Sequence, residues 1–279
     1  MRKIYWLLIL VLFCNQLCKA QNNKEITVGD EIFTMIFVEG GTFTMGATVD
    51  QGSTYKENEK PCHKVTLSDF YIGQFEVTQA LWVEVMGYNP SMRQEDMNYP
   101  VENVSWGDCM EFINKLNEMT GMKFRLPTES EWEFAARGGN QSKGYKYPGS
   151  NNFREVAWSD KWTKRDDWGG KTDIAPTHPV GGKKPNELGI YDLATNVAEW
   201  CYDAYEIWPK EFAVRPQTNP TGPDHYSWVN FGDKRVKSPK PHVVRGFGIG
   251  DDEFDHRICR RDCNDKASPY TGFRLALDL

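Results

Sequence analysis

The residues with the clearest chemical potential lie near the C-terminus, between Arg245 and Cys263. The spacing His256-x2-Cys259-x3-Cys263 is similar to that of zinc ligands, although the set lacks a defined fourth donor. A disulfide between the two cysteines is an alternative if their side chains converge. We favour a third interpretation, in which Cys259 is a small core residue and Cys263 has no special role.

The same segment is rich in acid, because four of the six residues from Asp251 to His256 are carboxylates. Such a run could bind a cation or a basic ligand, but it is more often a solvated loop. The preceding Gly246-x-Gly248-x-Gly250 comes before no expected helix, so it is only a weak indication of phosphate binding.

Short elements are expected to position these residues. Alternation around Gly40-Gly41 predicts two short strands joined by a tight turn within Ile32–Met45. Residues 46–60 are polar and predict a loop. Lys64–Leu67 and Phe70–Val77 have the composition of strands.

Three short helices are predicted next, within residues 78–87, 105–121 and 128–138. Each begins at a hydroxyl residue that can cap a helix, and each stops at a glycine. Thr128 and Glu131 additionally form a capping box. The apolar stripe expected on the second helix consists of Phe112, Ile113, Leu116 and Met119.

Residues 138–185 and 202–241 lack periodicity, which is typical of disorder or of long functional loops. The chain is 13% aromatic and has ten tryptophans. Disordered segments are poor in aromatic residues, so we expect ordered loops packed by Trp and Tyr. Short helices, short strands and long ordered loops together predict an α+β domain.

Residues 1–20 predict a secretory signal peptide, with a charged start, an apolar run over Ile4–Cys14 and small residues at the cleavage site. The run is shorter than the about 20 residues that span a membrane. Lipidation at Cys14 or Cys18 stays open and would be the only route to a membrane tether. We therefore expect an exported protein (periplasmic, cell-surface or secreted) with one domain over residues 21–279.

Removal of Arg2, Lys3 and Lys19 from the 33 basic residues leaves 30 against 39 acidic ones, a net charge of −9. No run of basic residues remains, so nucleic-acid binding is not expected. The cysteines left are odd in number, so at least one thiol is free or pairs between chains. These are Cys62, Cys109, Cys201, Cys259 and Cys263.

Nine blocks, in order, resemble the formylglycine-generating enzyme family, whose domains are also called sulfatase-modifying factors. One block would be weak, but nine in order make a chance match very unlikely. The resemblance covers nearly all of the mature chain and implies a C-type-lectin-like α+β fold with long ordered loops. The blocks are Phe37–Gly46, His63–Thr78, Met86–Ser91, Pro100–Trp106, Arg125–Gly139, Pro179–Gly181, Asn186–Trp200, Asn219–Pro223 and Gly272–Ala276.

The resemblance implies an oxidase that converts a cysteine of a client sulfatase to formylglycine with O2 and copper. The family holds Cu(I) with two cysteines five residues apart. Counted from Arg245, those positions carry Asp251 and His256 here, and the active-site serine position carries Gly248. Carboxylate and imidazole are harder ligands than thiolate and suit Cu(I) poorly, so copper is not expected.

The resemblance also implies Ca²⁺, held by the side chains of Asp192 and Glu199 and by the carbonyl oxygens of Thr195 and Val197. Hard oxygen ligands suit this cation. Thr195 stands where the family has glycine, and Ala198 where it usually has tryptophan. In the alternative, Asp192 caps a turn and Glu199 pairs with an arginine.

We expect an exported, non-catalytic member of this family that binds a ligand or a partner protein through the surface of the former active site. The intact scaffold and the missing cysteine pair favour this function. One alternative is an oxidase or another enzyme with a site rebuilt around His256, Asp251 and Cys259. The other is a structural component of a cell-envelope assembly.

Overall fold

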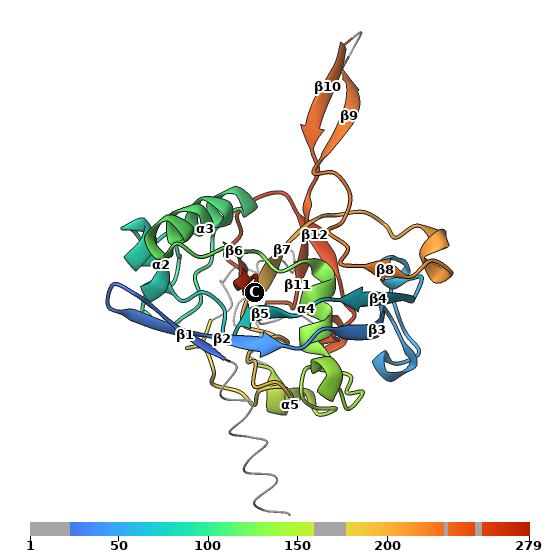
Figure 1. Cartoon of the computed structure of the whole chain (residues 1–279), viewed down its shortest axis with the longest axis horizontal. Coiled ribbons are helices and arrows are strands. Elements are labelled where there is room, and N and C mark those ends of the chain that lie inside the picture. The colour runs from blue at the N-terminus through green and yellow to red at the C-terminus, as the bar shows by residue number, and fades with distance from the viewer. Residues whose placement is uncertain (1–22, 159–176, 232–233, 249–252) are drawn as a thin grey trace, which may run out of the picture.

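The computed structural model describes residues 23–158, 177–231, 234–248 and 253–279 (Figure 1). The predicted signal peptide, residues 1–20, and Asp251 lie outside the described residues. Within these ranges, no helix has both the length and the apolar character needed to cross a membrane.

Four small sheets form the framework of the described residues. The largest has the order β1 (Lys24–Val28), β2 (Glu31–Val38), β5 (Phe70–Gly73), β14 (Ala276–Leu277) and β6 (Phe124–Arg125). A second has the order β12 (Asp262–Asn264), β11 (His242–Arg245), β7 (Ala198–Ala204) and β13 (Thr271–Gly272). The third contains β3 (Gly41–Met45), β4 (His63–Leu67) and β8 (Gln217–Thr218), and the last pairs β9 (Tyr226–Phe231) with β10 (Lys234–Pro239).

The three predicted helices are confirmed as α2 (Gln79–Met86), α3 (Trp106–Thr120) and α4 (Glu129–Ala136), and a single turn, α5 (Phe153–Val156), follows. The predicted caps form at all three N-termini, with full capping boxes on α3 and α4. Met119 is the exception to the predicted stripe of α3, because its side chain is 52% exposed.

The hairpin predicted around Gly40-Gly41 is wrong, because β2 pairs with β1 and β5 whereas β3 pairs with β4. The glycines carry the chain from one sheet to another. A Cβ atom on Gly40 would lie 2.4 Å from the carbonyl oxygen of Leu67, so only glycine permits this close crossing.

The prediction of irregular structure over 202–241 is also wrong in part, since β8, β9 and β10 lie there. β9 and β10 form a hairpin that projects from the body of the molecule (Figure 1). Neither strand pairs with any other described strand. The mixed α+β class with short helices and long loops is confirmed.

Two large apolar clusters fill most of the interior of the described residues, and a smaller third one lies around Tyr147 and Val156. One large cluster lies between α2, α3 and the five-stranded sheet, where Trp82 stacks on Phe112 with 5.2 Å between ring centroids. The other surrounds α4, all eight residues of which are buried. Because α4 includes Glu129, Glu131 and Glu133, its burial requires three compensated carboxylates.

Candidate functional site

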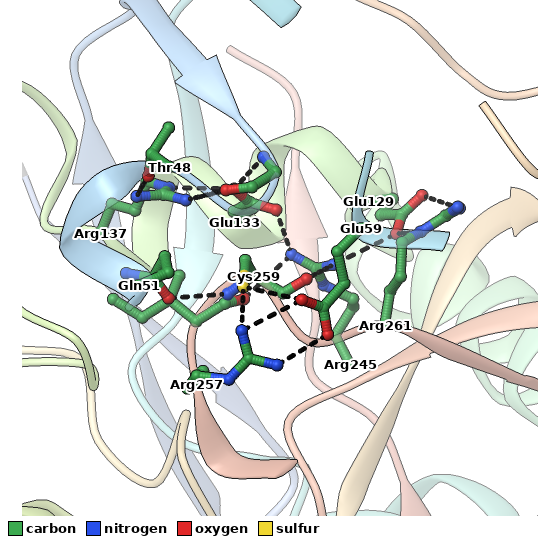
Figure 2. Close-up of polar contacts among 12 residues, drawn as sticks. Thr48, Gln51, Glu59, Glu129, Glu133, Arg137, Arg245, Arg257, Cys259 and Arg261 are labelled. Carbon is green, nitrogen blue, oxygen red and sulfur yellow. Dashed lines mark hydrogen bonds and ion pairs between the residues drawn. The ribbon is translucent and has the colours of Figure 1, made fainter. Parts of the chain in front are cut away.

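A buried network of arginines and glutamates lies on one side of α4 (Figure 2). Glu133 accepts hydrogen bonds from Arg245, from Arg137 Nε at 2.9 Å and from the Gly46 N–H at 2.9 Å. Burial alone would raise the pKa of Glu133, but the two guanidinium groups outweigh it and hold that pKa below its usual value. Glu133 is therefore a structural anion.

Two further pairs extend the network. Arg261 donates to both oxygens of Glu129, at 2.6 and 2.7 Å. Arg257 donates to both oxygens of Glu59, at 3.0 and 2.8 Å. These planar two-bond pairs join the 46–60 loop and α4 to the C-terminal segment, over sequence separations of more than 100 residues.

Cys259 lies at the centre of this network (Figure 2). Its sulfur accepts from Arg257 Nη1 at 3.1 Å, and its backbone N–H donates to Gln51 Oε1 at 3.1 Å. Burial, with Glu59 adding to it, raises the pKa of the Cys259 thiol. A neutral buried thiol is a poor nucleophile and a poor metal ligand, and the expectation that Cys259 is a core residue is confirmed.

His256, at the second family cysteine position, ends the short helix η5 (Glu253–His256). Its side chain is buried, its Nδ1 lies 2.7 Å from the carbonyl oxygen of Ala194, and its ring centroid is 4.9 Å from that of Phe153. The position is thus filled by a packed imidazole. Asp251, at the first cysteine position, lies outside the described residues.

All five cysteines in the described part of the chain are free thiols. The disulfide between Cys259 and Cys263 that the sequence left open is therefore not formed. Among the described residues, no three or more His, Cys, Asp or Glu side chains are grouped as metal ligands, which leaves the zinc hypothesis without support. Cys109 and Cys201 are fully buried, as expected.

The residues implied for calcium lie close together, and the Glu199 carboxylate among them is engaged with other groups. Arg274 donates to both oxygens of Glu199, at 2.5 and 2.6 Å, and Trp132 Nε1 donates to Oε2 at 2.7 Å. The pairing of Glu199 with an arginine, which was the alternative to calcium ligation, is therefore observed. The contacts of the other two residues do not involve their implied carbonyl ligands. The Thr195 hydroxyl accepts from the Trp158 N–H at 2.9 Å, and the Val197 N–H donates to Glu76.

Asp192 is the only implied ligand with an unused side-chain oxygen. Its Oδ2 accepts from the Gly181 N–H at 2.6 Å, whereas Oδ1 is buried without a partner in the described structure. Burial raises the pKa of Asp192 to about 6, against the effect of the Gly181 N–H and Arg274. A calcium ion here would use Asp192 Oδ1, the two carbonyl oxygens and the Glu199 carboxylate, and Glu199 would first have to leave Arg274. Calcium binding therefore stays an implication of the resemblance, and the Glu199–Arg274 pair favours the alternative.

The arginine–glutamate network is the part that sequence reasoning missed. The sequence predicts a capping role for Glu131 and a polar loop over residues 46–60, and neither prediction includes an ion pair. One signal was available, because Glu129, Glu133 and Arg137 are spaced four residues apart and so share one face of a helix. Sequence does not show that this face is buried.

Comparisons with known proteins show what this chain is similar to. A profile described as "Sulfatase-modifying factor enzyme 1-like domain" matches residues 20–279. "Chaperone protein LppX" of Paenibacillus barcinonensis is 36% identical over 244 residues, 73% of this chain and 81% of that protein. The formylglycine-generating enzyme of Thermomonospora curvata is 27% identical, over 88% of this chain and 93% of its own length. "Inactive C-alpha-formylglycine-generating enzyme 2" of Bos taurus is 36% identical over 50% of this chain and 44% of its own.

Solved structures share the fold. "Treponema denticola variable protein 1" superposes with a TM-score of 0.72 at 28% identity, covering 92% of this chain and 99% of that one. PvdO from Pseudomonas aeruginosa superposes with a TM-score of 0.67 at 23% identity, covering 92% and 98% of the two chains. At that level of identity the second likeness concerns the fold alone.

Proposed function

Because this chain belongs to the sulfatase-modifying factor family, we propose that it is an exported, non-catalytic member that binds a partner polypeptide. The family contains members of both kinds, since enzymes and a protein named inactive are both similar to this chain. The predicted signal peptide over residues 1–20 supports export.

The observation that carries the proposal is the chemistry at the two cysteine positions. Cu(I) needs soft sulfur donors, and these positions hold Asp251 and His256. The His256 ring is buried against Phe153 and held at the Ala194 carbonyl. A metal approaching this ring would meet a packed side chain.

No other described thiol replaces the missing pair. Cys259 is the nearest in sequence, and it is a neutral thiol enclosed by Arg257 and Glu59. Cys263 is half-buried on β12, where it pairs in register with Val243. Thiolate ligands for copper would therefore have to come from a rearranged C-terminal segment.

A polypeptide is the ligand best supported by the relatives. The similar protein LppX is named a chaperone, which is a protein that acts on other polypeptides. The described part of the former active-site surface is closed at His256. An open cavity lies instead beside the N-terminus of α4, on a chain with a net charge of −6.

The non-catalytic part of the proposal is tested by Cu(I) competition against a chromogenic chelator. The wild-type chain should bind Cu(I) at least a hundredfold more weakly than the double variant Asp251→Cys/His256→Cys, which restores the family's pair. Equal, tight binding by both proteins would contradict the proposal.

The partner is sought by cross-linking in the cells that make the protein. A photoreactive residue placed at Lys210, beside the open cavity, should attach to one recurring polypeptide. The same group at exposed Glu118 on α3 is the control and should not attach to it. Absence of a recurring polypeptide from position 210 would contradict partner binding at this surface.

A further inference from the structure

A cavity of about 280 Å³ opens between β4, the end of β7 and the loops that follow β7 and β8. Its walls are aromatic. The His63 ring contacts Trp208 edge-on at 4.7 Å and Phe212 at 5.2 Å between centroids. None of the residues implied for copper or calcium lies in its lining, so the cavity is separate from those positions.

Asp203 lies at the inner end of the cavity and is only 5% exposed. Its Oδ2 accepts from the Glu129 N–H at 2.8 Å and so caps α4. No described group donates to its Oδ1. The loop above the carboxyl has Gly222 at φ +73°, and a Cβ there would lie 3.0 Å from Oδ1. A glycine thus leaves space beside an acceptor that has no donor.

Most charges around Asp203 are already paired. From α4, Glu129 is bound to Arg261 and Glu131 is bound to Arg125. His63 of β4 has its Nδ1 2.9 Å from the Pro61 carbonyl oxygen. The cavity is therefore left with two acids that have no cation in the described structure.

These two acids are Asp203 at the inner end and Glu206 at the exposed rim. Oδ1 of Asp203 is open to the cavity and has no donor from the described residues, so a ligand donor can bind it, and the burial of the rest of the residue strengthens such a bond. Aromatic walls also favour a cation and can cover an aliphatic stem. The cavity therefore has the features of a site for an ammonium group at the end of an apolar chain.

We infer that this cavity binds the ammonium group of a lysine side chain presented by the partner polypeptide. The inference rests on the proposed function for the identity of the partner. Lysine suits the site better than arginine, because only one oxygen of Asp203 is free and a guanidinium fork needs two acceptors. The acidic chain would also attract a basic segment at long range.

The protonation state of Asp203 distinguishes an ammonium ligand from other ligands by the pH dependence of their affinity. Burial, with Glu129 and Glu131 adding to it, raises the pKa of Asp203 to about 8, although Arg261 opposes the rise. At pH 6 an ammonium ligand must displace this proton, whereas at pH 9 the carboxylate is already formed. Lysine keeps its charge to about pH 10, so its affinity should rise over this range. A ligand that accepts a hydrogen bond from the protonated acid would show the opposite trend.

The test is an NMR titration of the whole mature chain with the peptide acetyl-Gly-Lys-Gly-amide, alongside the same peptide with an acetylated lysine. We expect saturable shifts around the cavity for the lysine peptide and none for the acetylated one. Affinity should increase at least fivefold from pH 6 to pH 9. Free n-butylamine, included as a third ligand, should bind more weakly than the peptide.

Variants assign the effect to the cavity. Asp203→Asn should weaken binding at least tenfold and remove the pH trend. Glu206→Gln, at the exposed rim, should weaken binding of the lysine peptide about threefold. This variant still tests the inference if Asp203→Asn does not fold. Asp265→Asn removes one exposed charge outside the cavity and should leave binding unchanged.

Equal binding of the acetylated peptide, an affinity that falls with pH, or full affinity in folded Asp203→Asn would each overturn the inference. Binding of n-butylamine as tight as that of the peptide would assign the cavity to a free amine and would overturn the polypeptide source. A chain that attaches to a recurring partner but does not bind the lysine peptide would refute this inference alone. The proposed function would then stand.

Discussion

Asp203 shows how burial changes the chemistry of one residue. Its pKa of about 8 lies far above the value for an unfolded chain, so the folded protein holds a proton that the unfolded chain releases above about pH 4. The folded state therefore binds more protons between about pH 4 and pH 8. By linkage, this residue lowers stability as the pH rises through that window.

Replacement of Asp203 by Asn should remove this loss while the side-chain oxygen still accepts from the Glu129 N–H. From pH 6 to pH 9, the wild-type chain should lose about 2 kcal/mol of unfolding free energy relative to Asp203→Asn. Urea unfolding at both pH values measures the difference. Asp265→Asn is the control. If the unfolding free energies of all three proteins depended on pH in the same way, Asp203 of the folded chain would be ionised over the whole range from pH 6 to pH 9.

Whether calcium binds at the implied site depends on Glu199. Because Arg274 and Trp132 already occupy both of its oxygens, we expect 2 mM calcium to change Tm by less than about 1 °C, the same as magnesium. Differential scanning fluorimetry with and without a chelator makes the measurement. A calcium-specific rise of several degrees, lost in Asp192→Asn, would show that the site implied by the resemblance forms.

Among the elements, the hairpin of β9 and β10 depends on two histidines at its base. Nδ1 of His225 and Nε2 of His242 lie 3.0 Å apart, so one imidazole donates to the other. Trp106 stacks on His242 with 4.0 Å between centroids. Burial, with His225 adding to it, lowers the pKa of His242 to about 4. Protonation of both rings would break their hydrogen bond.

Acid should therefore loosen this hairpin before the body unfolds. The unfolded chain gains the His242 proton near pH 6.5 and the folded chain only near pH 4, so stability is lost as the pH falls through this window. At pH 5 the loss is about 1 kcal/mol, because His242 is only half-buried. Hydrogen exchange of the amides in 234–239 should speed up relative to the intrinsic rate.

His242→Gln should make hairpin exchange independent of pH between 5 and 7, after correction for the intrinsic rate. His178→Gln, which replaces a histidine stacked on Trp158 elsewhere, should leave the wild-type response. Unchanged hairpin protection at pH 5 in the wild-type chain would show that the histidine pair does not hold the hairpin.

The helices were predictable because their signals are local. Thr78, Ser105 and Thr128 each cap a helix within a few residues, and glycine marks each end. Strand pairing was less predictable, since partners are distant in sequence. Alternation around Gly40-Gly41 fits a hairpin and a crossing between sheets equally well. The β9–β10 hairpin is a case in which a local signal was present, because β9 has the sequence Tyr-Ser-Trp-Val-Asn-Phe and is rich in residues that favour strands.

At the scale of the whole molecule, the arginine–glutamate network joins segments that are far apart in the chain. It holds the 46–60 loop and the C-terminal residues against α4. The family and fold were predictable from ordered motifs. The network was not, because it depends on pairs such as Glu133 with Arg245 and Glu59 with Arg257, whose members lie 112 and 198 positions apart.

Loss of one network charge should destabilise the whole chain. Glu133→Gln leaves Arg137 and Arg245 short of an anion in a fully buried place, which costs about 3 to 5 kcal/mol. Glu111→Gln breaks an exposed pair with Lys115 on α3 and should cost less than about 0.5 kcal/mol. Chemical denaturation measures the unfolding free energy of both variants. A loss in Glu133→Gln as small as that in Glu111→Gln would mean that water reaches the network.

The central claim is that this family member lacks the family's oxidation chemistry. The most direct measurement is mass spectrometry of a sulfatase-motif peptide incubated with the copper-loaded chain, a reductant and O2, beside a family enzyme as positive control. We predict no loss of the cysteine thiol and no formylglycine above the level without protein. Formation of formylglycine that depends on the folded chain and on copper would contradict the account.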